Sequence, residues 1–249
     1  MENSRDKVAS SSGQGCSLDE RSRIQMLKAM GIQPWFSKYA SVQAAEEIQQ
    51  PVESLAIESN SVSNASKLNW QQLQQTISEC QLCELHTSRT QTVFGMGNPS
   101  ADLMIITEAP DKDEDRIGEP FVESPGQLLD AMLKAIDLSR ENVFITNIIK
   151  CTPAGDRKPH VSEIVCCDGY LQQQIELVQP KLILALGRIA THHLLVTKET
   201  LGALREKSHS YNGIPLIVSY HPDYLIRKPI EKRKSWQDLL QVKHTLKKL

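Results

Sequence analysis

The stretch LMIITEAP, residues 103–110, decides the fold. Its first five residues form a nearly continuous apolar run, which is typical of a strand buried on both faces. Three further runs have the same character, at Val143–Ile149, Leu182–Leu186 and Pro215–Tyr220. The sequence therefore predicts four short, buried strands.

Helical patterns separate these runs, at Gly126–Ile136, Val161–Val178, Arg188–Val196 and Ile230–Lys248. Strands that alternate with helices predict a three-layer α/β/α sandwich with a central, largely parallel four-stranded sheet. In such a sheet the site lies beyond the carboxyl ends of the strands. The segments expected there are Glu108-Ala109-Pro110, Asn147 to Cys151 and His221-Pro222.

The composition is that of an ordinary globular chain. Of its 249 residues, 40% are hydrophobic and 23% are charged, which excludes a collagenous or wholly disordered protein. The net charge of −2 does not by itself indicate a nucleic-acid binder. No apolar run approaches the roughly 20 residues that span a bilayer. The polar N-terminus lacks a secretory signal, so we expect a cytoplasmic protein with reduced thiols.

Residues 1–66 differ from the rest and predict a mostly disordered tail, followed by a domain over residues 67–249. The tail contains a capping box, Ser17-Leu18-Asp19-Glu20, and apolar residues at helical spacing, which predict a short amphipathic helix at about residues 17–31. Ser41–Lys67 is polar and has no aromatic residue, so it is expected to be a flexible linker.

The cysteines are the strongest chemical signal. Cys80 and Cys83 form a C-x-x-C pair, Cys151 ends the second predicted strand, and Cys167 lies on the next predicted helix. Four thiolates suit either zinc or a [4Fe–4S] cluster. Buried structural cysteines are the alternative. Cys166 adjoins Cys167, so spacing alone leaves the fourth ligand open, and Cys16 in the tail is expected to be free.

Residues 68–249 resemble the type-4, iron–sulfur uracil-DNA glycosylases, because several segments match that family in order and spacing. These segments are Glu108-Ala109-Pro110, Glu114-Asp115-Arg116-x-Gly118-x-Pro120-Phe121-Val122, Gly126-Gln127-Leu128-Leu129-Asp130, Thr146-Asn147-x-x-Lys150-Cys151-x-Pro153, Gly155-x-Arg157-x-Pro159, Leu186-Gly187 and His221-Pro222-x-x-Leu225. The resemblance implies a monomeric enzyme that excises uracil from DNA as the first step of base excision repair. It also implies a [4Fe–4S] cluster, and the family's spacing selects Cys167 over Cys166.

The resemblance also assigns roles at the site. Glu108 stands at the position of the family's acidic group, and His221 at that of its leaving-group histidine. Asn147 has both acceptor and donor atoms, so it can read the N3–H and O4 edge of uracil. Phe121 is expected to stack on the flipped base, with Ala109 and Pro110 lining the substrate pocket.

A DNA-binding face is expected near the C-terminus. Residues 227–248 carry eight basic and two acidic side chains, whereas residues 102–123 carry eight acidic and two basic ones. Such polarity steers DNA to the basic side. Arg227, Lys228 and Arg157 are the DNA-binding candidates, and Leu225 stands at the family's wedge position.

Some positions depart from the family. Thr107, Asp111, Glu123, Thr152 and Asp156 replace residues that are commonly glycine, arginine or asparagine there. Asp111 and Glu123 add bulk and negative charge near a phosphate-bearing substrate. A weakly active or inactive iron–sulfur DNA-binding module, associated with replication or repair, is therefore the alternative function.

The tail suggests a partner. Met26 to Trp35 resembles the N-terminal peptide of the psi subunit of bacterial DNA polymerase holoenzyme, which docks on the clamp loader. An exposed Trp35 would suit a partner groove. We therefore expect residues 17–36 to recruit the domain to a replication protein, although a helix that packs on its own domain is an equal alternative.

Overall fold

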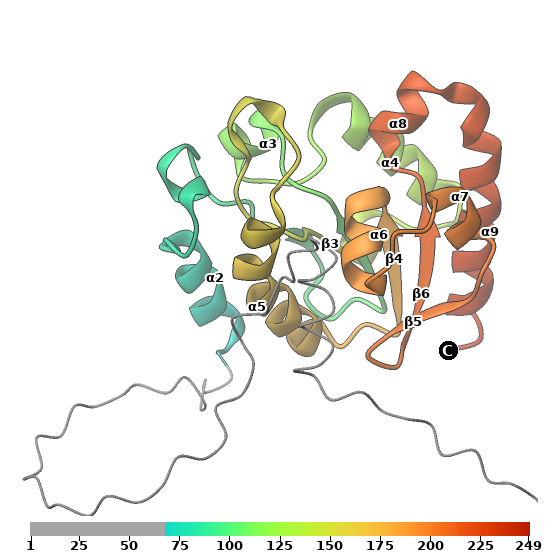
Figure 1. Cartoon of the computed structure of the whole chain (residues 1–249). Helices are drawn as coiled ribbons and strands as arrows, with labels where there is room; N and C mark the ends of the chain where they lie inside the picture. The colour runs from blue at the N-terminus through green and yellow to red at the C-terminus, as the bar shows by residue number, and fades with distance from the viewer. Residues whose placement is uncertain (1–67) are drawn as a thin grey trace, which may run out of the picture. The chain divides into compact units, whose positions relative to one another are not determined.

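The computed structural model describes residues 68–249, except for the side chain of Asp156 (Figure 1). The tail predicted over residues 1–66, its helix, its linker and Cys16 lie outside the described residues. Within them, no helix is both long and apolar enough to cross a membrane.

A six-stranded sheet forms the middle layer, in the order β1–β3–β2–β4–β6–β5. Its four central strands are all parallel, as predicted: β2 (Leu103–Thr107), β3 (Val143–Asn147), β4 (Leu182–Leu186) and β6 (Ile214–Ser219). In the register, Thr107 at the end of β2 lies beside Asn147 at the end of β3. The parallel core therefore brings the segments after β2 and β3 together.

Two short edge strands were not predicted. β1 (Met96–Gly97) pairs antiparallel with β3, and β5 (His209–Tyr211) pairs antiparallel with β6. Both are only partly buried and contain no apolar run, so neither has the sequence pattern of a buried strand. The predicted four-stranded sheet thus matches the parallel core, and the whole sheet has two further edge strands that the prediction missed.

Helices cover both faces of the sheet. The α-helices are α2 (Trp70–Ser78), α3 (Lys112–Ile117), α4 (Glu123–Lys134), α5 (Val161–Val178), α6 (Arg188–Leu195), α7 (Leu201–Arg205), α8 (Pro222–Arg227) and α9 (Lys232–Leu246). Short 3₁₀ turns are η1 (Glu84–Thr87), η2 (Arg140–Asn142), η3 (Ala154–Asp156) and η4 (Pro229–Glu231). The four predicted helices correspond to α4, α5, α6 and α9, whereas α2, α3, α7 and α8 were not predicted.

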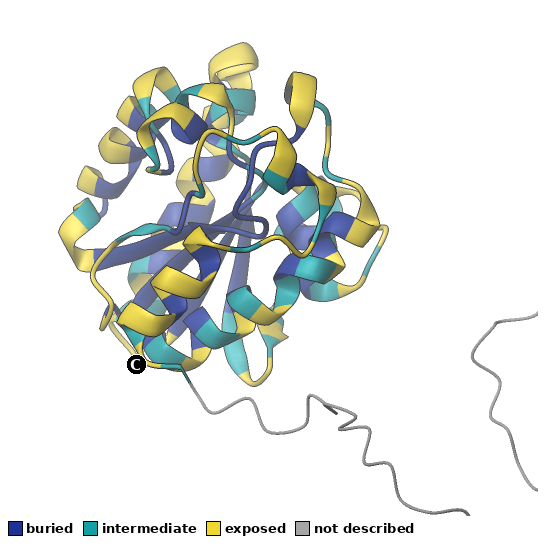
Figure 2. Ribbon diagram, turned by 90° about the vertical axis from the view of Figure 1, so that its left-hand side faces the viewer, coloured by how far each residue is buried: buried dark blue, intermediate teal, exposed yellow. Residues whose placement is uncertain are grey.

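The central strands are buried (Figure 2), and alternate side chains enter two separate cores, one on each face of the sheet. Met104 and Ile106 of β2 belong to a core shared with α2, α5 and α6. Leu103 and Ile105 point the other way, into a core shared with α4, α8 and α9. Two cores, one on each face of the sheet, confirm the predicted three-layer sandwich.

α2 belongs to the domain although its Gln-rich sequence resembles a linker. Asn69 caps it in a reciprocal capping box with Gln72. The ring of Trp70 lies edge-on to Phe94 and Phe144, with centroids 5.1 Å away in each case. This aromatic packing fixes α2, and the C-x-x-C segment that follows it, against the first core.

Candidate active site

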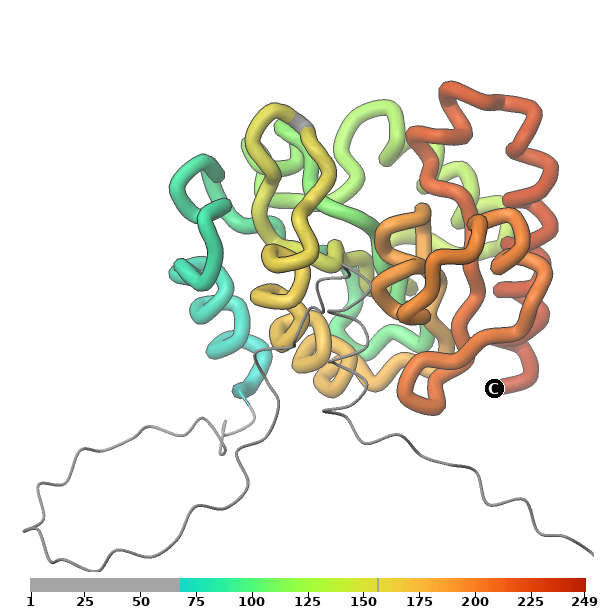
Figure 3. The backbone as a smooth tube through the Cα atoms, viewed as in Figure 1, coloured from blue at the N-terminus to red at the C-terminus, as the bar shows by residue number. Residues whose placement is uncertain are grey.

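Three predicted site segments meet at one edge of the sheet. Glu108 follows β2, Asn147 ends β3 and His221 follows β6, and all three strands run in the same direction. The loops and short helices after these strands rise together at the top of the molecule (Figure 3). This is the carboxyl edge at which α/β proteins bind their ligands.

The carboxylate of Glu108 lies at the N-terminus of α6. Its Oε1 accepts a hydrogen bond from the backbone N–H of Ile189 at 2.8 Å. Gly187 makes room for it, because a Cβ there would lie 2.6 Å from that oxygen, and the backbone has a φ of +90°. The helix N-terminus favours the ionised carboxylate. The backbone of α6 thus fixes the position of the Glu108 carboxyl group at the edge of the site.

His221 is both a site residue and the N-cap of α8. Its Nδ1 accepts a hydrogen bond from the backbone N–H of Asp223 at 3.2 Å. A nitrogen that accepts carries no proton, so Nε2 carries it in the neutral ring. Burial lowers the pKa of His221, although the charges of Glu108 and Asp223 oppose this shift. The imidazole is therefore held neutral, with Nε2–H as its donor.

Phe121 stacks on His221, with ring centroids 5.3 Å apart and planes at 24°. Its backbone has a φ of 56°, which is rare outside glycine. Two contacts hold this conformation: Phe121 N–H donates to Glu114 Oε1 at 2.6 Å, and Arg140 Nη2 donates to the Phe121 carbonyl at 2.7 Å. Phe121 is 1% exposed, so its ring is part of the wall of the site.

Sequence reasoning gave no role to Glu114 or Arg140. Glu114 is buried, and burial, followed by the charge of Asp111, raises its pKa to about 7. The nearby side chain of Asn147 acts in the opposite direction. Glu114 therefore lies between the Phe121 backbone and Asn147, where its protonation state affects the site. Its place in a family motif was the only signal in the sequence.

The side chain of Asn147 is buried without a partner. The residue is 1% exposed, and within residues 68–249 neither Oδ1 nor Nδ2 makes a hydrogen bond of good geometry, although the amide lies close enough to the Glu114 carboxyl to lower its pKa. Such a buried, unpaired amide costs about 1–3 kcal/mol per group. A side chain that retains both a free donor and a free acceptor is suited to a ligand that supplies the complementary groups.

A hollow of about 160 Å³ lies beside Glu108 and includes several predicted residues. Its lining contains Glu108, Ala109, Pro110, Asp111, Arg157 and Ile189. Arg157 is not free, because its Nη1 and Nη2 donate to Glu163 at 2.9 and 2.5 Å. Binding a phosphate with Arg157 would therefore compete with this ion pair.

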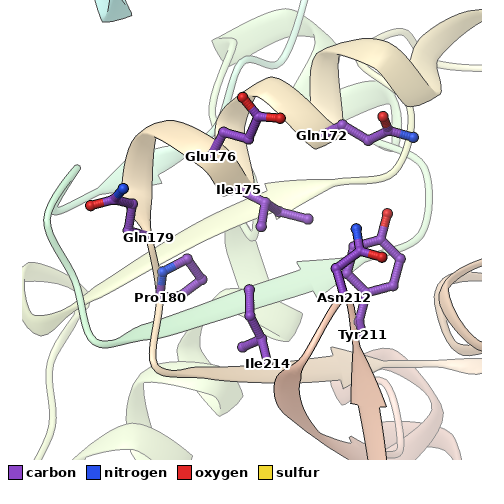
Figure 4. Close-up of a pocket in the computed structure, with 8 residues that line it drawn as sticks. All are labelled: Gln172, Ile175, Glu176, Gln179, Pro180, Tyr211, Asn212 and Ile214. Atoms are coloured by element: carbon purple, nitrogen blue, oxygen red, sulfur yellow. The ribbon is translucent and has the colours of Figure 1, made fainter.

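A larger hollow of about 440 Å³ lies elsewhere, between the end of α5 and the β5–β6 hairpin (Figure 4). It is lined by Gln172, Ile175, Glu176, Gln179, Pro180, Tyr211, Asn212 and Ile214. It adjoins the amino end of β6, opposite the edge that carries His221, and contains none of the predicted site residues.

Asp111 has a local structural role. Its carboxylate caps α3, accepting from the backbone N–H groups of Asp113 and Glu114 at 2.9 Å each. Thr152 Oγ1 donates to the Asp111 carbonyl at 3.0 Å. Asp111 and Thr152, two positions at which this chain differs from the family, thus contact each other. Asp111 also stabilises α3, the helix that carries Glu114.

The predicted wedge is buried. Leu225 is 1% exposed and belongs to the core beneath α8, so this structure does not present it to a DNA duplex. The next residue, Ile226, is 40% exposed. Arg227 is exposed and paired with Asp223 at 2.6 Å, and Lys228 is exposed at the end of α8. Arg227 and Lys228 therefore lie on the surface and Leu225 lies beneath it, and the DNA-binding roles of all three stay predictions.

The cysteines predicted as ligands come from three segments. Cys80 and Cys83 are half-buried, and Cys151 and Cys167 are 4% and 5% exposed. Burial raises the pKa of Cys83, as do the thiols of Cys166 and Cys80. Among residues 68–249, no three His, Cys, Asp or Glu side chains are arranged to hold a metal ion as they stand.

Burial favours the neutral form of these thiols, and basic side chains oppose that effect. Arg89 Nη1 lies 3.1 Å from Cys151 Sγ, where it can donate to the sulfur. Burial raises the pKa of Cys167 to about 11, and the thiols of Cys151 and Cys83 add to that shift. The thiol of Cys83 also raises the pKa of Cys151. The three thiols are therefore neighbours, although they are far apart in the sequence. Cys166 is also close to Cys83, so the structure does not choose between Cys166 and Cys167.

Comparison with known proteins gives a consistent result. The profile of the Uracil DNA glycosylase superfamily matches residues 94–240. A type-4 uracil-DNA glycosylase from Saccharolobus solfataricus is 38% identical over 179 residues, covering 68% of this chain and 83% of that protein. One from Archaeoglobus fulgidus is 38% identical over 161 residues, covering 61% and 81%. One from Thermotoga maritima is 33% identical over 176 residues, covering 69% and 92%.

Proposed function

Because the chain belongs to the uracil-DNA glycosylase superfamily, we propose that this site excises uracil from DNA by hydrolysing the N-glycosidic bond, the first step of base excision repair. The observation that carries the proposal is the buried, unpartnered amide of Asn147. Uracil offers an N3–H donor and an O4 acceptor, which complement Oδ1 and Nδ2. Cytosine offers the inverse pattern and would require the amide to turn by about 180°.

The other residues fit the charges that develop as the bond breaks. The sugar gains positive charge at C1′ and the base leaves as an anion, taking the bonding electron pair. The Glu108 carboxylate, fixed by Ile189 N–H, can stabilise the sugar cation and orient the attacking water. His221, neutral and with its proton on Nε2, can donate to uracil O2. Phe121 supports this arrangement by stacking on the imidazole.

A gel assay tests the proposal with a single-stranded oligonucleotide that contains one uracil. Glu108→Ala and His221→Ala should each slow excision on the order of 10²-fold or more, with DNA binding nearly unchanged. Asn147→Asp should weaken the preference for uracil over cytosine, because a carboxylate cannot donate to O4. Asn98→Asp, an exposed asparagine before β2, is the matched control and should be neutral.

Two results would contradict the proposal. The first is wild-type protein that excises no uracil, which would favour the inactive DNA-binding module as the function. The second is an Asn147→Asp variant with unchanged base preference, which would contradict the pocket assignment. The three relatives above are all named as glycosylases, and nothing in the described site favours the inactive module.

We also propose a [4Fe–4S] cluster held by Cys80, Cys83, Cys151 and Cys167. Two observations support it: none of these cysteines, which come from three segments, forms a disulfide, and an arginine faces one of the sulfurs. The names of the relatives place them in type 4. When bound, the cluster would join the α2–η1 region, the end of β3 and α5. Iron and sulfide analysis of purified protein tests this, and zinc alone would contradict it.

Uracil-containing DNA is the partner that the superfamily implies. A monomeric state, a cytoplasmic location and recruitment to a clamp loader through residues 17–36 stay predictions. The last is tested by deleting residues 1–66, which should leave excision unchanged and abolish capture of the replication partner.

A further inference from the structure

A group of large apolar side chains is exposed between α8 and α9. Ile226 is 40% exposed, Ile230 in η4 is 83% exposed, and Trp236 on α9 is 41% exposed. Apolar side chains gathered in one surface region, rather than scattered singly, mark a contact surface. We call the surface over residues 226–236 the η4 ridge.

The η4 ridge is also basic. Five of its residues are Lys or Arg and one is acidic. Arg227 pairs with Asp223, and Lys234 with Glu231. Three cations remain, namely Lys228, Lys232 and Arg233, which form no ion pair or side-chain hydrogen bond within residues 68–249. These neighbouring positive charges repel one another and favour a polyanion as the occupant.

A hollow of about 210 Å³ adjoins the ridge, between α4 and α9. Its floor is apolar, with Leu128, Met132 and Leu225, while Lys232, Ser235 and Trp236 form the α9 side. A flat aromatic ring that enters here would meet the Trp236 indole and have a cation beside it. This combination suits a nucleobase with its phosphate, as on other single-strand binding surfaces.

The ridge is continuous with the proposed site. α8 begins immediately after His221 and has six residues, so it is about 9 Å long. Because DNA advances about 3.4 Å per nucleotide, the far end of α8 lies about two to three nucleotides from the base at His221. A strand that runs from the site along α8 therefore reaches this end of the molecule.

We infer that the η4 ridge binds the single strand that flanks the excised uracil. Lys228, Lys232 and Arg233 hold its phosphates, and Trp236 stacks on one unpaired base. A protein partner is the less suitable occupant, because lysine is depleted at protein interfaces. The inference rests on the proposed function, which supplies the reason for DNA to lie here.

The test measures the affinity of the full chain for a uracil-free single-stranded oligonucleotide by fluorescence anisotropy. Trp236→Ala should weaken binding about tenfold, and Trp236→Phe should restore most of it, because phenylalanine still stacks. The double variant Lys232→Gln, Arg233→Gln should also weaken binding. It should lower the slope of log K against log salt by about 1.4, since two phosphate contacts are lost.

Lys198→Gln, Lys207→Gln, two exposed lysines outside residues 227–248, is the matched control and should leave the affinity and the salt slope unchanged. Thermal melting verifies that each variant is folded. Unchanged affinity in both ridge variants would overturn the inference, as would an equal loss in the control. Because binding is measured without uracil, the readout is separate from catalysis. Wild-type protein that binds through the ridge but excises nothing would contradict only the proposed function.

Discussion

At the scale of single residues, Phe121 and Glu123 both hold left-handed backbone, each with a φ of 56°. This conformation costs a non-glycine residue about 1–2 kcal/mol. Glu114 and Arg140 hold the backbone of Phe121 on both sides, whereas Glu123 is exposed at the first turn of α4. Site residues thus hold the strained backbone of Phe121. The strain at Glu123 has a separate cause, because a non-glycine residue stands at that position.

Glu123→Gly should therefore raise the free energy of unfolding by up to about 1 kcal/mol, because glycine adopts this φ freely. Glu123→Ala is the control, since it removes the charge and keeps the strain. If the carboxylate itself crowds the DNA, both variants should raise the rate of uracil excision. Denaturant unfolding and the gel assay separate the two effects, and equal stability of all three proteins would contradict the strain argument.

The raised pKa of Glu114 leads to a second prediction about a single residue. Its pKa is about 7 in the fold and ordinarily 4.5, so between these values the folded state holds a proton that the unfolded state releases. Stability should therefore fall as pH rises from about 4.5 to about 7, by at most about 3 kcal/mol. Glu114→Gln should remove this part of the pH dependence, as measured by urea unfolding at several pH values. An unchanged profile would contradict the assignment.

At the scale of elements, a buried ion pair joins α7 to α9. Arg205 Nη2 and Asp238 Oδ1 lie 2.7 Å apart, and their side chains are only 6% and 4% exposed. Ser219, at the end of β6, donates to Asp238 Oδ2 at 2.6 Å. The guanidinium also lies 4.8 Å from the centre of the Tyr220 ring. Two helices and the strand that leads to His221 are therefore tied by one network.

Arg205→Ala should lower the free energy of unfolding by about 3–5 kcal/mol, because it leaves Asp238 buried without its partner. Lys207→Ala is the control: Lys207 and Glu199 also form an ion pair, but the two side chains are 52% and 48% exposed. Such a pair contributes about 0–1 kcal/mol. If Arg205→Ala and Lys207→Ala lowered the free energy of unfolding equally in urea, burial would not explain the contribution of the Arg205–Asp238 pair.

The elements also show why parts of the sequence could be interpreted and others could not. The four parallel strands were predictable because burial on both faces leaves a continuous apolar run. Leu225 and Ile226 are adjacent, and the sequence does not reveal which of them faces the core. That choice depends on the phase of α8, which the cap at His221 and the packing against α4 determine. The capping role of Asp111 likewise depends on a short helix with no apolar periodicity.

At the scale of the whole molecule, the proposed cluster would connect segments that the sheet alone does not. Cys167→Ser should remove the broad visible absorption and lower the melting temperature by at least about 5 °C. Cys166→Ser should do neither. Iron analysis and thermal melting of both variants provide the measurement. The reverse pattern would assign the fourth ligand to Cys166.

One contact links acid sensitivity to DNA engagement. His221 Nδ1 is the acceptor that caps α8, and a protonated imidazole has no acceptor left. Uptake of a proton would therefore change the ring and release the first turn of α8 in a single event. Since the pKa of His221 is lowered by burial, this would occur only below the usual histidine range. In acid the ring would keep its Nε2–H donor but lose the acceptor that caps α8, so the proposed η4 ridge would lose the cap of the helix that leads to it, and binding of the strand would weaken in that one titration.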